Sequence, residues 1–183
     1  MLRYGLAALA LKTFSIGDVS KKIYRWVGNA YGSKQRGKAN IESYVDRGNL
    51  LVDLCRKYRA IKEGDELLEI GTGWMHWYSL YLRLFYNVSI TMLDIWDNRQ
   101  FTALKSSFSK LEKMSEQLPR NDKVAESLHR IISANDFERL YRDLWLKYVI
   151  DERGSLDQFP ENSFNSISAF TFLNTFHEKI PWN

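Results

Sequence analysis

The chain has 183 residues, of which 45% are hydrophobic and 26% are charged, and its formal net charge is +4. This balance fits one globular domain, with or without a small appendage. The single cysteine, Cys55, excludes an internal disulfide and a multi-cysteine metal site, and no run reaches the ~18 apolar residues of a membrane-spanning helix. We expect a cytoplasmic protein with no metal centre, and Cys55 in its core.

The first sixty residues are predicted to be helical. Apolar residues recur at helical spacing over residues 16–31 and again in "ANIESYVDRGNLLVDLCRKYRAI". The start, "MLRYGLAALALKTF", resembles a signal peptide, but Lys12 interrupts its apolar run and no small-residue cleavage pattern follows. We therefore expect an N-terminal helical segment over residues 1–60 and a second domain over residues 61–183.

Strand-like and helical patterns alternate in the second domain. "EGDELLEIG" predicts a turn and a short buried strand, "NVSITMLDIW" predicts a second strand, and the stretch between them has room for one helix. Such a β-α-β unit implies a parallel sheet with a right-handed crossover. Residues 99–147 predict a helical insertion, and "YVIDERG" and "SFNSISAFTFLN" predict strands three and four. The predicted fold class is α/β, a Rossmann-like parallel sheet of about four strands flanked by helices.

Gly71-Thr72-Gly73 joins the first predicted strand to an aromatic helix expected to begin at Trp74. A tight turn there directs backbone N–H groups and the positive end of the helix dipole toward the carboxyl edge of the sheet. Open α/β sheets bind ligands at that edge. A dinucleotide fingerprint would need a glycine where His76 stands, and a P-loop would need a lysine before Ser or Thr. The turn is therefore predicted to hold a cofactor of another kind.

Three short motifs resemble those of class I S-adenosylmethionine-dependent methyltransferases. "LLEIGTGW" is similar to the family's first motif through Glu69, Gly71 and Gly73, although a methionine replaces its frequent third glycine. "TMLDIWD" supplies Asp94, which lies 21 positions after Gly73, close to the ~20 expected for an acid that binds ribose. "LDQFPENSFNSIS" is similar to the stretch that opens the family's fourth strand, with Asn165 where the family usually has Asp.

The resemblance implies that S-adenosylmethionine is the cofactor. Asp94 would accept hydrogen bonds from both ribose hydroxyls. Glu69 would reach the methionine amino group, and the alternative is an acid that only accepts N–H bonds within the turn. A general base is placed by several relatives after strand four, where this chain offers His177. The cofactor-binding residues expected on this basis are Glu69, Gly71, Thr72, Gly73, Asp94 and, facing the adenine amino group, Ser155 or Asp157.

The implied function is methyl transfer to a small-molecule or saccharide-like acceptor. Class I methyltransferases usually have seven strands, so the resemblance leaves about three unaccounted for after strand four. We expect a fragment of a longer protein, a reduced domain, or a sheet completed by a homodimer or a partner chain. One alternative function is a non-catalytic S-adenosylmethionine-binding or scaffold domain that needs a partner. Another is a nucleic-acid-binding module, for which the sequence shows no recognisable RNA-binding motif.

Several polar residues near these motifs have interpretations that need no ligand. His76, Ser79 and Arg83 share one stripe of the aromatic helix, and we favour a solvent-facing outer face over a catalytic role. Asp97 is expected to be a solvent-facing cap of the helix that follows it. The insertion over residues 99–147 would wall the substrate pocket, or else act as scaffolding or as a dimer surface.

Overall fold

The computed structural model describes residues 40–114, 118 and 122–169, which belong to a unit comprising Asn40–Asn183. The predicted helix over residues 16–31 and the candidate base His177 lie outside the described residues. Within the described residues, no helix combines the length and the apolar character that crossing a bilayer requires.

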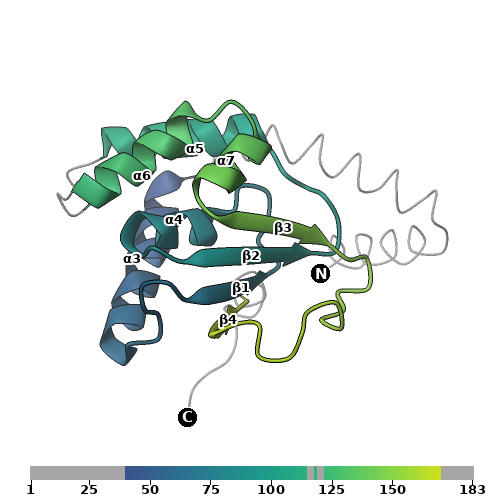
Figure 1. The fold of residues 1–183 in the computed structure, drawn as a ribbon. Helices are drawn as coiled ribbons and strands as arrows, with labels where there is room; N and C mark the ends of the chain where they lie inside the picture. The colour runs from purple at the N-terminus through teal and green to yellow at the C-terminus, as the bar shows by residue number, and fades with distance from the viewer. Residues whose placement is uncertain (1–39, 115–117, 119–121, 170–183) are drawn as a thin grey trace, which may run out of the picture. The chain divides into compact units, whose positions relative to one another are not determined.

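The sheet contains four parallel strands in the order β3-β2-β1-β4 (Figure 1). They are β1 (Glu66–Ile70), β2 (Ser89–Asp94), β3 (Leu146–Ile150) and β4 (Ser166–Ser168). The central strands β1 and β2 are mostly buried, as expected of parallel strands covered on their faces. The prediction of an α/β fold with a Rossmann-like parallel sheet and flanking helices is confirmed.

The ends of the third and fourth strands differ from the prediction. β3 begins earlier and ends at Ile150, because the chain then turns, with the Gly154 N–H donating to the Asp151 carbonyl at 2.8 Å. β4 is short, but Asn165 extends its pairing with β1. The Asn165 N–H donates to the Glu66 carbonyl at 2.7 Å, and its side-chain oxygen accepts the Glu66 N–H at 2.8 Å. Asn165 therefore helps to set the register of β4.

The described helices pack against one another beside the sheet (Figure 1). They are α3 (Ile41–Tyr58), α4 (Trp77–Phe85), α5 (Phe101–Lys113), α6 (Asp122–Ser133) and α7 (Phe137–Asp143). The three helices α5 to α7 confirm the helical insertion predicted from residues 99–147. α3 lies in the same unit as the sheet and packs against α4 and α5, and Cys55 on α3 is buried, as predicted.

Helix α4 is buried on nearly all sides, as its aromatic sequence predicts, and it packs against α3 and α6. The predicted start at Trp74 is wrong, because the helix begins at Trp77. His76 precedes it as the N-cap with a φ of +50°, in the left-handed region. The turn after β1 is consequently longer than the sequence indicates, and Trp74 and Met75 belong to it.

Gly48 marks the closest approach of α3 to α4. A Cβ atom added to Gly48 would lie 2.6 Å from Cδ1 of Tyr81. The Tyr81 side chain is fully buried and its hydroxyl donates to the Asn49 side-chain oxygen at 2.7 Å. The ring is therefore held in place, and only a residue without a side chain fits at position 48.

We expect Gly48→Ala to lower the free energy of unfolding by about 1–3 kcal/mol, because overpacking in a tight core outweighs a helix-propensity gain of ~1 kcal/mol. Urea denaturation followed by circular dichroism measures the change. Asp53→Ala, at an exposed position of the same helix, is the control and should change stability by less than ~0.5 kcal/mol. Equal stability of Gly48→Ala and the parent chain would contradict the tight packing.

Candidate functional site

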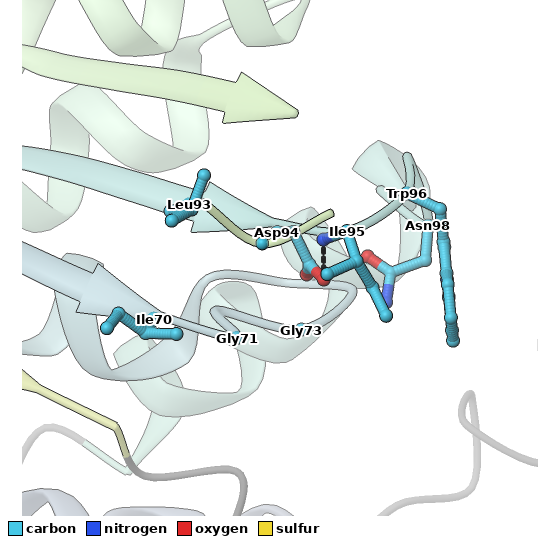
Figure 2. Close-up of a pocket in the computed structure, with 9 residues that line it drawn as sticks. Ile70, Gly71, Gly73, Leu93, Asp94, Ile95, Trp96 and Asn98 are labelled. Atoms are coloured by element: carbon cyan, nitrogen blue, oxygen red, sulfur yellow. Dashed lines mark hydrogen bonds between the residues drawn. The ribbon is translucent and has the colours of Figure 1, made fainter. Parts of the chain in front are cut away.

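A cavity of about 240 Å³ lies at the carboxyl edge of the sheet, where β1 and β2 end (Figure 2). Its mostly apolar lining comes from the glycine turn after β1, from the end of β2 with the residues that follow, and from the loop after β3. This is the edge at which open α/β sheets bind ligands. The lining residues are Ile70, Gly71, Gly73, Leu93, Asp94, Ile95, Trp96, Asn98 and Gly154.

The glycine turn presents its backbone to this cavity. Gly71 and Gly73 have φ angles of +72° and +74°, a region that residues with side chains rarely adopt. The Gly71 N–H donates to the Leu93 carbonyl at 2.8 Å, which ties the turn to β2. A Cβ atom added to Gly73 would meet no atom of the described residues within 4 Å. The space beside Gly73 is therefore open to a bound molecule.

Asp94 ends β2, and its side chain points toward the glycine turn (Figure 2). Its side-chain Oδ1 accepts the Ile95 N–H at 2.9 Å, and the carboxylate also accepts a backbone hydrogen bond from Gly73. Burial raises the pKa of Asp94 above its ordinary value, and the two N–H bonds act against that shift. The structure thus brings together three residues predicted from the sequence: Gly71, Gly73 and Asp94.

Asn98 is a lining residue that the sequence analysis did not single out. Its side-chain oxygen is buried and has no hydrogen-bond partner within the part of the chain that the structure describes. A donor group on a ligand would satisfy it. Asn98, Ile95 and Trp96 all follow closely after Asp94, so their position near a strand-end acid was a usable signal. The direction of their side chains was not readable.

Glu69 lies behind the glycine turn and does not line the cavity. The residue is 3% exposed. Its Oε2 accepts hydrogen bonds from the hydroxyls of Thr72, at 3.2 Å, and Ser79, whereas its Oε1 is buried with no partner among the described residues. Burial raises the pKa of Glu69 to about 7, against the effect of these hydroxyl bonds. Glu69 therefore connects the turn to α4 through the hydroxyl groups of Thr72 and Ser79.

Thr72 also points away from the cavity and extends the hydrogen bonding inward. Its Oγ1 lies 3.0 Å from Nδ1 of His76, and Nε2 of His76 lies 2.7 Å from the Tyr141 hydroxyl on α7. Burial lowers the pKa of His76 to about 3. The ring is therefore neutral near pH 7, so one nitrogen donates and the other accepts. A continuous polar chain runs from Glu69 to Tyr141.

The predicted solvent-facing stripe on α4 is wrong. His76, Ser79 and Arg83 are 0%, 1% and 5% exposed. Helices α3 and α6 pack against α4 and leave it no outer face. The three side chains instead make hydrogen bonds inside the protein, with Nη1 of Arg83 donating to the Tyr86 carbonyl at 2.8 Å.

Asp97 is exposed to solvent, as predicted, but the prediction that it caps the next helix is wrong. The residue that caps α5 is Gln100, and it makes no side-chain capping bond. Asp97 instead accepts two hydrogen bonds from the Arg99 guanidinium, at 2.8 and 2.6 Å. That guanidinium lies 4.6 Å from the ring centroid of Tyr148 on β3. The pair connects the loop after β2 to the third strand.

Ser155 and Asp157 lie on the loop after β3, but only Gly154 of this loop is among the described residues that line the cavity. The Ser155 Oγ accepts the Asp157 N–H at 3.1 Å, and Asp157 is exposed. The choice between the two as the adenine contact therefore stays open.

The insertion packs as scaffolding in the described structure. α6 contacts α4, α5 contacts α3 and α6, and α7 contacts β3. None of these three helices supplies a described lining residue of the cavity. Across the described ranges, no group of three or more His, Cys, Asp or Glu side chains is arranged to hold a metal ion.

Comparisons of this chain with protein-family models, with curated proteins and with solved structures found no match. What the cavity binds therefore has to be argued from its own residues.

We expect Glu69→Gln to change the pH dependence of stability. The pKa of Glu69 rises from 4.5 to about 7 on folding. Protonated Glu69 therefore makes its full contribution to the free energy of unfolding below pH 4.5, and this contribution is lost as the pH rises through 7. Glutamine keeps the shape without ionising. The variant should match the parent near pH 4 and exceed it at pH 8 by up to about 3 kcal/mol in free energy of unfolding.

Urea denaturation at pH 4, 6 and 8 measures this difference. His76 acts in the opposite direction, because its pKa falls from 6.5 to about 3 on folding and its stability is lost as the pH falls. The parent chain and Glu69→Gln both contain His76, so the difference between their free energies of unfolding reports the ionisation of Glu69 alone. Glu112→Gln, at an exposed position of α5, is the matched control. A difference that does not vary with pH would refute the raised pKa of Glu69.

Proposed function

We propose that this chain binds S-adenosylmethionine at the carboxyl edge of the sheet and is a methyltransferase that acts on a small-molecule or saccharide-like acceptor. One observation carries the proposal: the Asp94 carboxylate and the Gly71–Gly73 turn line the same cavity. A strand-end carboxylate opposite a glycine turn is the arrangement that recognises the ribose of a nucleoside in open α/β sheets.

Asp94 has the acceptor capacity that a ribose requires. An ionised carboxylate offers about four lone-pair positions, of which the backbone N–H groups of Ile95 and Gly73 occupy two. Two vicinal hydroxyls would take the remaining positions through charge-assisted hydrogen bonds. The unsatisfied oxygen of Asn98 offers a further acceptor in the same cavity. This polar set supports binding of a sugar that carries neighbouring hydroxyls.

The remaining walls suit a planar base. Ile70, Leu93, Ile95 and Trp96 give the cavity its apolar surface, and sites for nucleosides and other small molecules combine such walls with a few placed polar groups. The volume of about 240 Å³ is below the ~300–1,000 Å³ of a pocket that encloses a whole drug-sized ligand. We therefore assign only the nucleoside half of the proposed cofactor to this cavity.

S-adenosylmethionine supplies a methyl group on a cationic sulfur that is already activated toward a nucleophile. The task left to the protein is to hold and orient the donor and to exclude water. The glycine turn, Asp94 and the apolar walls would do this for the nucleoside. His177 stays a prediction as general base, since it lies outside the described residues.

A non-catalytic S-adenosylmethionine-binding domain is the second candidate. Asp94 is the only ionisable side chain among the described residues that line the cavity. Glu69 and His76, the other ionisable groups near the turn, are buried in the polar chain behind it. A site with this composition is equipped to bind a nucleoside, and a partner chain would then complete any active site.

We further propose a cytoplasmic setting, because the one cysteine is a buried free thiol. The proposed partner is a second copy or another chain that pairs along β4. Among the described strands β4 pairs only with β1, and an open strand edge accepts a further strand.

We expect Asp94→Asn to weaken binding of S-adenosylmethionine and of its demethylated product by at least about tenfold, since a hydrogen bond to a charged group contributes ~1.5–3 kcal/mol. Isothermal titration calorimetry measures both ligands. Asp122→Asn removes an equivalent charge from an exposed position on α6 and should leave affinity unchanged. Binding of NAD in place of S-adenosylmethionine, or equal affinity in Asp94→Asn, would overturn the proposal.

Transfer of a labelled methyl group separates the two candidate functions. The full chain is incubated with methyl-labelled S-adenosylmethionine and a cell extract, and the label is followed into small-molecule, saccharide, protein and RNA fractions. An enzyme should label the small-molecule or saccharide fraction, and Asp94→Asn should reduce that labelling by at least about tenfold. Binding without transfer supports the non-catalytic domain. Strongly salt-dependent RNA binding without methyl transfer supports the nucleic-acid-binding module instead.

A further inference from the structure

A second cavity, of about 320 Å³, lies at the opposite, amino edge of the sheet. Its lining includes Asn87, shortly before β2, and Trp145, immediately before β3. The rest comes from the end of α4, from α6 and from the end of α7. In contrast to the first cavity the lining is mainly polar, and it contains the three cationic side chains Arg83, Lys123 and Arg130.

Among the described residues, Arg83 is a buried guanidinium without a counter-ion. The residue is 5% exposed, and no carboxylate within the described ranges forms an ion pair with it. Its Nη1 donates to the Tyr86 carbonyl at 2.8 Å and to the Asn87 side-chain oxygen at 3.2 Å, whereas its Nε is buried with no partner in the part of the chain that the structure describes. Its Nη2 has no hydrogen bond to a described residue. Buried charges in proteins are normally paired, because an uncompensated one is strongly unfavourable.

The neighbouring carboxylates are already engaged. Glu63, whose charge raises the pKa of Arg83 against the larger effect of burial, bonds to Nζ of Lys123 at 2.8 Å and to the Asn87 N–H at 2.9 Å. Glu126 bonds to Arg130 at 2.6 Å. Arg130 is itself close enough to lower the pKa of Arg83 by like-charge repulsion. Within the described residues, the cavity therefore has positive charge without an acid to neutralise Arg83.

Asp143 completes the charged lining, and it too has partners. Its carboxylate lies 3.4 Å from Nε of Arg139 and 3.6 Å from Nε of Arg142. Its backbone carbonyl accepts a hydrogen bond from Arg130 at 3.3 Å. Asp143 therefore helps to fix Arg130 at the cavity and does not pair with Arg83.

Trp145 forms an aromatic wall beside this charge. Its φ of +53° is a left-handed conformation that bulky residues rarely adopt. The conformation leaves the residue 58% exposed, with its ring centroid 5.4 Å from the Arg83 guanidinium carbon. Strained backbone of this kind persists where the surrounding structure requires a particular side-chain position. Here it places an indole over the unpaired guanidinium at the mouth of a cavity.

We propose that this second cavity binds a phosphate group, either inorganic phosphate or the phosphate of a small phosphomonoester. Arg83 is its buried partner, because a guanidinium offers several donors in a planar fork that fits phosphate oxygens. Lys123 and Arg130 lie at the rim and add charge-assisted bonds. A phosphate has more acceptor oxygens than a carboxylate, which suits the unsatisfied donors of Arg83 together with two rim cations that each keep an acid partner of their own. The proposal concerns a different cavity from the S-adenosylmethionine site and does not depend on it.

The experiment is a titration of the full chain with inorganic phosphate, followed by calorimetry and by the shift in melting temperature. Sodium chloride holds the ionic strength constant, so that general screening is not mistaken for binding. We expect saturable binding and a rise in melting temperature. A parallel titration with glycerol phosphate distinguishes inorganic phosphate from a phosphomonoester as the ligand. Tighter binding of glycerol phosphate identifies an organic phosphate.

Variants at the rim of the cavity test where phosphate binds. The side chains of Lys123 and Arg130 are partly exposed, so removing them leaves the core intact. Lys123→Gln and Arg130→Gln should each weaken phosphate binding by about threefold, because water screens an ion pair between partly exposed groups. Arg83→Lys should weaken it further, because it keeps the charge and removes the fork. Arg153→Gln, on the exposed loop after β3, is the matched control and should bind as the parent does.

The proposal is overturned if phosphate has no saturable effect beyond that of chloride. It is also overturned if Lys123→Gln and Arg130→Gln bind phosphate as tightly as the parent chain. These two variants test the location of the site even where Arg83→Lys fails to fold. Loss of phosphate binding in them with S-adenosylmethionine binding intact would establish the two cavities as separate sites.

Discussion

The structure around the candidate site depends on one buried carboxylate, that of Glu69 at the end of β1. A carboxyl group that is 3% exposed needs hydrogen-bond donors from within the protein. The hydroxyls of Thr72 and Ser79 provide them, one from the turn and one from the first part of α4. Thr72 continues to His76, and His76 to Tyr141 on α7. The need to satisfy Glu69 therefore links β1, the turn, α4 and the insertion.

This inward bonding explains why backbone, and not side chains, faces the cavity. With Thr72 directed toward Glu69, the exposed part of the turn is made by Gly71 and Gly73, whose positive φ angles no larger residue would adopt as readily. The Gly73 N–H then meets the Asp94 carboxylate from β2. Separate requirements thus arrange the two halves of the site. Behind the turn, the Oε2 atom of Glu69 needs the hydroxyl donors of Thr72 and Ser79, and in front of it Asp94 keeps spare acceptor positions.

Sequence patterns predicted much of the fold because the signals were local. Strand runs and helical stripes placed the four strands and the helices of the insertion, and strand-end spacing placed Asp94 opposite the turn. The patterns did not reveal which way polar residues face. His76, Ser79 and Arg83 were predicted to form an outer stripe because the covering helix α6 lies far away in sequence, and the start of α4 was missed because His76 adopts a left-handed φ. Gly154 reaches the cavity only through tertiary structure, and the sequence did not show that the Asn98 side chain turns toward it.

Because the polar residues of α4 are buried, they serve the interior of the protein and not its surface. His76 and Ser79, at the start of the helix, bond to the residues behind the glycine turn at the carboxyl edge of the sheet. Arg83, near its end, lines the cavity at the amino edge. Glu69 has its charge reduced by a raised pKa and its hydrogen bonds supplied from within, whereas a guanidinium stays charged near pH 7 and cannot respond in that way. Of the buried ionisable groups Glu69, His76 and Arg83 beside α4, Arg83 is the one that keeps its full charge near pH 7, and its environment therefore calls for an outside partner.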